Sequence, residues 1–234
     1  MATPDPVLAT DASFLYLSKT AGVPVFAPHD GSGGASLYAA TLDSHPEQQS
    51  PSDADEWPAG FAAGIVHRLD TWTSGLVIAA RSLEALAAAR AAFAEHRLSK
   101  GYFFLSDRDV SWDEHRVDHD LAHDRRKRSR MTWKRGQATP HRGQWYQAET
   151  RLRRAEQGGG GYRLWQATMA TGVMHQIRVH AASVGIPLLG DKRYGGGAPM
   201  PGSAAEFFLH HEGLMGPDLR PPKIPVPDFW PAPR

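Results

Sequence analysis

The chain has 234 residues, enough for one large domain or two small ones, and we expect one domain with insertions. Its formal net charge of +1 excludes a globally basic nucleic-acid-binding protein, so any such surface must be local. It contains no Cys, which excludes disulfides, thiol nucleophiles and Cys-ligated zinc. No apolar run is long enough to span a bilayer and residues 1–6 lack the pattern of a leader, so we expect a soluble, cytoplasmic protein.

The first predicted elements precede a long Gly- and Pro-rich segment. Phe14–Lys19 is an aliphatic and aromatic run typical of a strand. Residues 28–60 are expected to be mostly loop, interrupted by a short helix over Ser36–Leu42. The apolar run Gly64–Val66 then predicts a second strand, which ends in a tight loop of small and hydroxylated residues.

That loop carries the first candidate for chemistry. Arg68 and Asp70 stand two residues apart within the sequence Gly-Ile-Val-His-Arg-Leu-Asp-Thr-Trp-Thr-Ser-Gly of residues 64–75. Loops held by a rigid scaffold often display catalytic side chains. An Asp beside Thr and Ser is also a common turn former or helix cap, so composition alone leaves both interpretations open.

The following segment has the clearest regular structure of the chain. Gly75–Ala80 is expected to be a fully buried strand. Ser82–Leu98 is predicted to be a helix, because it begins with a capping Ser and a first-turn Glu and is rich in Ala. Ser99–Leu105 follows as an aromatic strand that contains Tyr102, which composition alone assigns to the core.

A basic cluster comes next. Residues 125–130 read Arg-Arg-Lys-Arg-Ser-Arg, with Lys134 and Arg135 behind them and Met131 and Trp133 between. Such a run is commonly a solvated face, but cations beside an indole also suit RNA phosphates. The sequence leaves these two interpretations open.

The remaining elements complete a fold of the α+β class. Trp145–Arg154 and Tyr162–Met169 alternate apolar and polar residues and predict an antiparallel pair joined through a run of Gly at 158–161. Thr171–Val184 predicts a helix stopped by Gly185, and the Pro-rich tail is expected to lie extended on the surface. Strands paired locally and few helices indicate a mixed, largely antiparallel sheet flanked by a few helices.

Three motifs together resemble those of the RluA-type pseudouridine synthases. The first is Gly64–Asp70 with Thr73-Ser74-Gly75, and the second is Lys100-Gly101-Tyr102. The third runs from Thr171-Gly172 through His175–His180, with Gly190-Asp191 and Tyr194-Gly195 behind it. The resemblance implies a single catalytic domain over residues 14–216, with tails at 1–13 and 217–234. The residues before Phe14 are too few for the small RNA-binding domain that some relatives carry.

The family resemblance implies an RNA uridine isomerase whose three catalytic residues are Asp70, Tyr102 and Arg178. Asp70 would be the nucleophile, because a carboxylate can bond covalently to the nucleoside or take a proton from the sugar, and the sequence leaves these open. Tyr102 would lie over the uracil and act as general base on the product. Arg178 would pair with Asp70, since a guanidinium stays charged and holds a buried carboxylate ionised. Arg68 would fill the gap left by the extruded base.

The same resemblance and the basic cluster give the expected RNA contacts. They are His67, Arg68, Thr73, His175, Gln176, Arg126, Lys127, Arg128 and Arg130. The substrate would be ribosomal or transfer RNA, with no membrane, no metal and no cofactor, and the protein would be a monomer. Where the family has Thr-Gly-Arg-Thr-His-Gln, this chain has Val173 and Met174 in place of the Arg and the second Thr, which affects substrate contacts. Lys19-Thr20-Ala21-Gly22 replaces Lys-Pro-Ala-Gly.

Two alternatives compete with this assignment. His115, His119 and His123 are spaced by four residues, so on a helix they would line one face and suit a zinc-dependent hydrolase. A catalytically silent RNA-binding protein of the same fold is the other alternative, favoured by Val173 and Met174 but opposed by the intact catalytic set.

Overall fold

The computed structural model describes residues 5–27, 34–155, 161–216, 219, 221–228 and 230. The chain folds into two compact units. The first comprises the described residues of Met1–Leu98 and His211–Pro225, and the second those of Ser99–His210 and Val226–Arg234. The boundary between the units falls inside residues 14–216, the range that the sequence predicts to be a single catalytic domain. That the two units act as one catalytic domain therefore stays a prediction.

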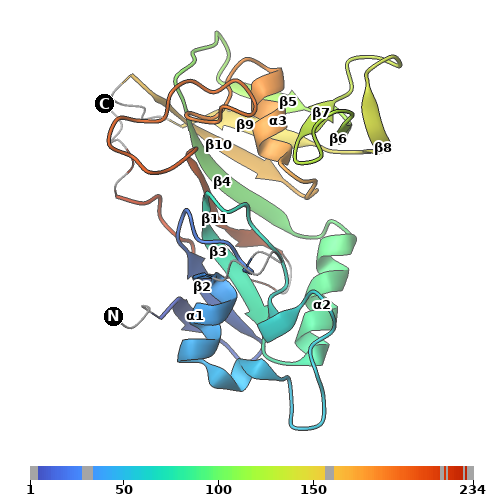
Figure 1. Cartoon of the computed structure of the whole chain (residues 1–234), viewed down its shortest axis with the longest axis vertical. Helices are drawn as coiled ribbons and strands as arrows, with labels where there is room; N and C mark the ends of the chain where they lie inside the picture. Colours follow the sequence, from blue (N-terminus) through green and yellow to red (C-terminus); the bar gives the residue numbers. More distant parts are fainter. Residues whose placement is uncertain are drawn as a thin grey trace. The chain divides into compact units, whose positions relative to one another are not determined.

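The first unit is built on a sheet in the order β1-β2-β3-β11 (Figure 1). Its strands are β1 (Val7–Thr10), β2 (Phe14–Lys19), β3 (Thr73–Ala80) and β11 (Leu209–Met215, which enters from the second unit at His211). Its helices are α1 (Leu37–Ser44), the 3-10 turns η1 (Pro46–Gln49) and η2 (Ala62–Gly64), and α2 (Leu83–Ala94). The strand, the short helix and the long helix predicted from sequence are all present.

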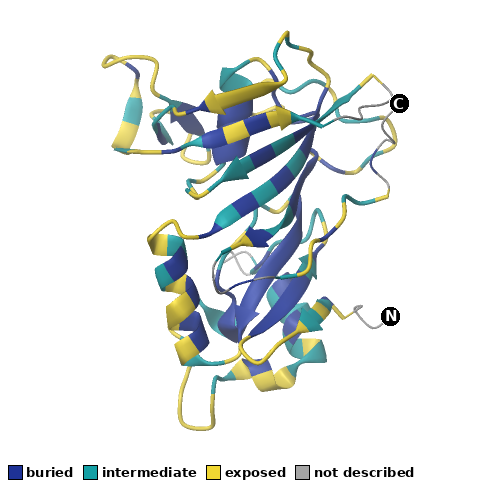
Figure 2. Ribbon diagram, turned by 180° about the vertical axis from the view of Figure 1, so that it is seen from behind, coloured by how far each residue is buried: buried dark blue, intermediate teal, exposed yellow. Residues whose placement is uncertain are grey.

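Both faces of this sheet are buried, which explains the continuous apolar run of β3. Every residue of β3 is buried (Figure 2). Leu76, Ile78 and Ala80 pack in one cluster with Leu86 of α2, and Val77 and Ala79 pack in a second cluster with Leu37 of α1. Because successive side chains of a strand point to opposite faces, a strand covered by helices on both sides needs apolar residues at every position.

The ends of the helices follow local rules. The Ser82 hydroxyl accepts a hydrogen bond from the Ala85 amide at 3.1 Å, and Ser36 caps α1 in the same way. The helix α2 ends at Ala94, before the predicted Leu98, because His96 adopts a left-handed backbone with φ of 55°. The predicted strand at Gly64–Val66 is reduced to a single bridge between Ile65 and Ala79.

The second unit contains two groups of strands and one helix. The first group follows the order β4-β10-β9-β5, and the second follows β7-β6-β8. The elements are β4 (Ser99–Ser106), β5 (Glu114–Val117), β6 (Leu121–Asp124), β7 (Met131–Trp133), β8 (His141–Tyr146), β9 (Thr150–Arg154), β10 (Arg163–Met169) and α3 (Gln176–Ser183). The β9–β10 and β10–β4 ladders are antiparallel, as predicted, and the fold is α+β.

Three predicted elements differ from the structure of this unit. The predicted strand Trp145–Arg154 is divided, because β8 pairs with β6 whereas β9 pairs with β10 and β5. The predicted helix from Thr171 begins only at Gln176. The predicted loop Gly158–Gly161 lies outside the described residues except for Gly161.

The Pro-rich tail is not simply laid on the surface, which corrects the sequence prediction. Leu219 and Ile224 are buried in the core cluster of the first unit. Trp230 is buried in the second unit, where its ring lies 5.7 Å from that of Phe208 and 6.2 Å from that of His210. Apolar residues between the prolines therefore anchor the tail.

Candidate active site

Asp70 lies in a turn immediately before the buried strand β3. The Thr73 amide donates a hydrogen bond to the Asp70 carbonyl at 3.0 Å, which closes the turn. Asp70 is half-buried, and Arg68 beside it is exposed. The turn is thereby tied to a strand whose every residue is buried, while Asp70 itself is only partly buried. This is the display that the sequence predicts.

The buried side chain of Lys19 stabilises this turn. The Lys19 side chain at the end of β2 is 1% exposed, and its ammonium donates to the carbonyls of Thr20 at 3.1 Å, Val23 at 2.7 Å and Thr71 at 2.8 Å. The Gly22 amide also donates to the Thr71 carbonyl, at 2.9 Å. Two turns separated by about fifty residues of sequence are therefore clamped around one cation.

The charge of Lys19 is coupled to Asp70. Burial lowers the pKa of the Lys19 ammonium to about 8, and the negative charge of Asp70 acts in the opposite direction. The sequence prediction assigned no role to Lys19, although its motif was recognised.

His67 and Thr73, two expected RNA contacts, are engaged inside the first unit. The His67 Nε2 accepts a hydrogen bond from the Ile78 amide at 3.2 Å, and its ring packs 5.4 Å from that of Phe93. Thr73 is 2% exposed at the start of β3. These residues order the turn; contact with RNA stays a prediction for them, as it does for the exposed Arg68.

Tyr102 lies on β4 of the second unit, opposite Ala167 of β10. It is 6% exposed, and Lys100, two residues earlier on the same face of the strand, is 7% exposed. Burial lowers the pKa of Lys100 to about 8. A Cβ atom on Gly172 would stand 2.9 Å from the Lys100 ammonium, so the second and third motifs meet at this point.

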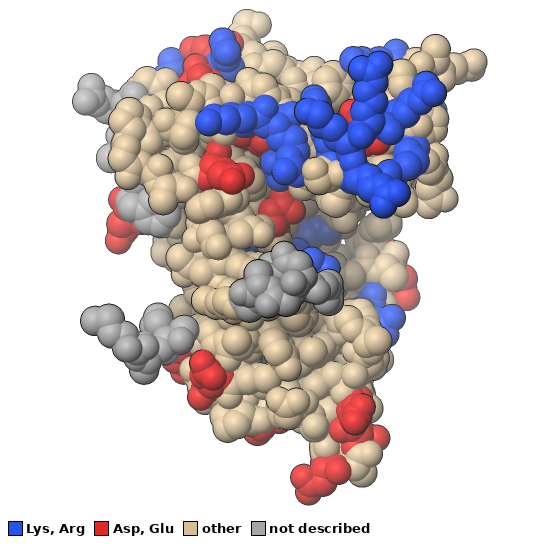
Figure 3. Space-filling model, in the orientation of Figure 1, with Lys and Arg blue, Asp and Glu red and all other residues tan. Residues whose placement is uncertain are grey.

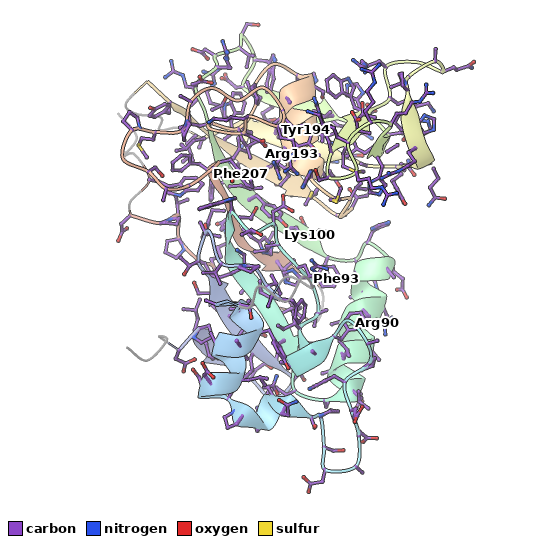
Figure 4. The ribbon with its side chains drawn as sticks, viewed as in Figure 1. Arg90, Phe93, Lys100, Arg193, Tyr194 and Phe207 are labelled. Atoms are coloured by element: carbon purple, nitrogen blue, oxygen red, sulfur yellow. The ribbon has the colours of Figure 1, made fainter. Side chains whose placement is uncertain are left out.

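Arg178 lies in α3 and is 5% exposed. Its Nε donates to Asp191 Oδ2 at 2.6 Å and its Nη2 donates to Asp191 Oδ1 at 3.0 Å, a bidentate geometry that fixes the guanidinium plane. Its Cζ lies 4.2 Å from the ring centroid of Phe207 and 5.2 Å from that of Tyr194. Figure 4 labels Phe207 and Tyr194. The sequence prediction did not name Asp191 as a partner, and the pairing of Arg178 with Asp70 stays a prediction.

Gln176 holds the loop that precedes α3. Its Nε2 donates to the Glu149 carbonyl at 2.9 Å and to Thr150 Oγ1 at 3.0 Å. Its Oε1 accepts from Thr171 Oγ1 at 3.0 Å and from the Val173 amide at 3.1 Å. All four hydrogen-bonding positions of the amide are used inside the unit, so we no longer expect Gln176 to contact RNA directly.

Tyr194 joins this loop to the β6–β7 hairpin, which carries the basic run 125–130. Its hydroxyl accepts from the Met131 amide at 2.9 Å, which leaves its proton for His175 Nδ1 at 2.7 Å. Burial raises the pKa of Tyr194 to about 12, so the hydroxyl keeps this proton. His175 has a left-handed backbone with φ of 55°, a strained conformation for a non-Gly residue. Met174 beside it is 40% exposed.

The basic run 125–130 forms the loop between β6 and β7. The Asp124 carboxylate accepts from the amides of Arg126 at 2.8 Å and Lys127 at 2.9 Å, which shapes the loop and lowers the pKa of Asp124. Arg126, Lys127 and Arg128 are exposed. Lys and Arg gather on the visible face of the second unit around this hairpin (Figure 3), so a net charge of +1 conceals a local basic surface.

The zinc alternative does not fit the fold. His115 lies on β5, His123 lies on β6, and His119 lies between these strands, so the helix that would align them does not exist. Within the described ranges, no group of three His, Cys, Asp or Glu side chains is arranged to hold a metal ion. Nor is any helix in those ranges long and apolar enough to cross a membrane.

Known proteins are similar to this chain in sequence. A family model described as RNA pseudouridylate synthase matches residues 13–183. RNA pseudouridine synthase 2, chloroplastic, of Oryza sativa subsp. japonica is 38% identical over 136 residues, which are 57% of this chain and 29% of that protein. Ribosomal large subunit pseudouridine synthase D of Zymomonas mobilis is 38% identical over 136 residues, 56% of this chain and 39% of that protein. The chain thus spans well under half the length of these relatives.

Solved structures support the fold. Human RNA Pseudouridylate Synthase Domain Containing 1 superimposes with a TM-score of 0.71 over 95% of this chain and 82% of its own, at 23% identity. Human RNA Pseudouridylate Synthase Domain Containing 4 gives a TM-score of 0.68 over 95% of this chain and 89% of its own, at 21% identity. At these identities the likeness concerns the fold.

Proposed function

Because this chain belongs to the RNA pseudouridylate synthase family, we propose that it isomerises uridines in RNA to pseudouridine, with Asp70 as the nucleophile. The observation that carries the proposal is the half-buried Asp70, displayed on a turn whose Thr71 carbonyl accepts from the buried Lys19 ammonium, which also binds the carbonyls of Thr20 and Val23. A carboxylate nucleophile needs a fixed position from which to attack. A nearby positive charge favours the negatively charged form, which is the form that attacks.

The reaction exchanges one bond and one proton within the nucleoside. The bond between the sugar and the ring nitrogen breaks, and a bond between the sugar and a ring carbon forms. That carbon loses a proton and the nitrogen gains one, so no external reactant is required. Asp70 bonds to the nucleoside or takes a proton from the sugar, Tyr102 removes the carbon-bound proton, and Arg178 pairs with the aspartate during the reaction.

The uridine must leave its stack before it can react. Extruding a base from a duplex costs a few kcal/mol, which contacts to the displaced strand must offset. Arg68 is exposed two residues before Asp70 and is suited to fill the vacated space. The exposed cations at 126–128 supply phosphate contacts.

Ribosomal RNA is the first substrate to test and transfer RNA the second. Several relatives are named as ribosomal large subunit pseudouridine synthases. Recognition of RNA by such a surface depends on loop shape and unstacked bases more than on a linear code. Cytoplasmic location, a monomeric state and independence of metal and cofactor remain predictions.

The decisive experiment replaces the nucleophile by its isostere. RNA from cells that lack the gene is incubated with the wild-type protein, Asp70→Asn or Asp53→Asn, and pseudouridine is quantified by mass spectrometry of the nucleosides. Asp53 is an exposed loop residue of the same unit and controls for the change of charge. We expect new pseudouridine with the wild type and Asp53→Asn, and none with Asp70→Asn. Full activity of Asp70→Asn would refute the assignment, and RNA binding without isomerisation by the wild type would favour the silent alternative.

A further inference from the structure

A basic pocket of about 580 Å³ lies within the second unit. It is lined by the β6–β7 loop, by α3 and by the segment from Gly190 to Phe207. Its size falls in the range of pockets that hold small ligands. The charged residues of its lining are Lys127, Arg130, Arg178, Asp191, Lys192, Arg193 and Glu206.

The charge of this lining is strongly positive. Five cations stand against two carboxylates, a difference of three. Asp191 is already neutralised by the bidentate contact with Arg178, and Glu206 is exposed. Among the described residues, neither Lys127 nor Lys192 makes an ion pair, so both ammonium groups remain available to an incoming anion. The concave shape concentrates their field.

The cations come from two walls that are fastened together. Lys127 and Arg130 belong to the hairpin loop, whereas Lys192 and Arg193 follow Asp191. Arg193 Nη1 donates to the Ser129 carbonyl at 2.5 Å, and this hydrogen bond joins the two walls. Arg193 and Phe207 are seen near Tyr194 beside α3 in Figure 4.

A second link connects these walls to the third motif. The Tyr194 hydroxyl bonds to the Met131 amide of β7 and to His175 Nδ1. The Arg130 guanidinium lies 5.5 Å from the ring centroid of Tyr194, on a ring that Arg178 also contacts. The pocket is therefore formed before any ligand arrives, which reduces the ordering cost of binding.

We infer that this pocket binds one phosphodiester of the RNA backbone, with the attached nucleoside in the remaining volume. The inference rests on the proposed function and names the contact that the second unit makes with the substrate. A phosphodiester carries one negative charge and several acceptor oxygens, which match cations from both walls. Because Arg178 lines the pocket and the proposed function makes Arg178 a catalytic residue, the bound phosphate would belong to a nucleotide close to the uridine that reacts.

The test measures RNA affinity as a function of salt. The full chain is titrated onto a fluorescent 12-nucleotide single-stranded RNA that contains uridines, at several KCl concentrations. Lys127→Ala and Lys192→Ala remove one exposed cation from each wall, and Lys223→Ala removes an exposed lysine of the first unit as a matched control. For each variant the slope of log affinity against log salt is compared with that of the wild type.

Two cations that hold the same phosphate predict a non-additive result. Each single substitution is expected to weaken binding about tenfold and to reduce the slope by about 0.7, the value for one single-strand phosphate contact. The double substitution is expected to reduce the slope no further, and Lys223→Ala to leave it unchanged. Unchanged slopes in both single variants overturn the inference. A double variant that loses twice the slope also overturns it, because the two lysines would then bind separate phosphates on an open surface.

Competition separates RNA from a free anion. At constant ionic strength, inorganic phosphate or uridine 5′-monophosphate is added to the complex of the protein with the fluorescent RNA. Each is added at up to about 10 mM, a concentration at which weak ligands bind. We expect RNA and each of these two anions to compete for the pocket. If one of the anions saturates the pocket and RNA binding does not change, the inference is overturned. All titrations are repeated with Asp70→Asn. Binding does not need turnover, so failure of the pocket appears as unchanged slopes, whereas failure of the proposed function appears as pseudouridine formed by Asp70→Asn.

Discussion

Replacing Lys19 by Met is expected to change stability little and activity greatly. The substitution removes one donor from each of the Thr20, Val23 and Thr71 carbonyls, but the Thr20 carbonyl keeps the Val23 amide and the Thr71 carbonyl keeps the Gly22 amide. Leaving the Val23 carbonyl without this donor costs about 1–3 kcal/mol. The change also removes a buried charge whose pKa is lowered from 10.5 to about 8, a burial penalty of about 3 kcal/mol. The two effects nearly cancel, so the net loss is about 1 kcal/mol or less.

Activity is not subject to that cancellation. Without the ammonium the turns at residues 20–23 and 70–73 lose their common anchor, and a displacement of about 1 Å at a nucleophile can cost a hundredfold in rate. Urea unfolding and single-turnover pseudouridine formation are measured for Lys19→Met and for Leu17→Met, a core control on the same strand. We expect about a hundredfold loss of rate in Lys19→Met alone. A rate equal to that of Leu17→Met would refute the reasoning, and so would a loss of stability above about 4 kcal/mol.

Three further predictions concern other residues. Tyr194→Phe removes the hydroxyl that bonds to His175 and to the β7 amide, and single-turnover assays should show slower isomerisation with stability reduced by about 1–3 kcal/mol. Burial lowers the pKa of His180 from 6.5 to about 4, so as the pH falls the unfolded state binds a proton at this imidazole before the folded state does. Urea unfolding should therefore show that the free energy of unfolding decreases by about 3 kcal/mol between pH 6.5 and 4. Gly75 has a φ of 114°, and the Cβ of Gly75→Ala would stand 2.2 Å from a carbonyl oxygen of β11, so circular dichroism should detect no native fold. The control is Gly213→Ala on β11, which should fold because its Cβ would meet nothing closer than 4.0 Å.

Sequence signals that act over a few residues predicted most elements of both units. The Ser caps of α1 and α2 and the unbroken apolar run of β3 are such signals, because each depends on neighbours along the chain. The predictions that were wrong required knowledge of distant partners. Residues 145–154 have one alternating pattern, but β8 and β9 pair with different strands. The start of α3 was placed too early because Gln176 holds the preceding loop through its side chain.

The candidate site shows the same division between local and distant information. The Asp70 turn was predicted from its own residues and motif. The supports of the predicted catalytic residues were not, since Lys19 reaches the Thr71 carbonyl across 52 positions of sequence and Arg178 reaches Asp191 across 13. The three His residues show the opposite error, because a spacing of four residues predicts a common face only if the segment is helical. Here the segment forms two strands.

Val173 and Met174 are expected to change which part of the second unit meets RNA. The family resemblance implies an Arg and a Thr at these positions, whereas here Val173 packs against the cluster that contains Tyr194, and Met174 is 40% exposed. The loop therefore contributes apolar surface, and the positive charge near Arg178 comes from the hairpin and from Lys192 and Arg193. We therefore expect the exposed Met to offer a base a flexible apolar contact, and the proposed phosphate contacts to come from the cations of the pocket. Affinity and its salt dependence should then follow the hairpin and the basic pocket, whereas Met174 should influence which nucleotide beside the uridine is accepted.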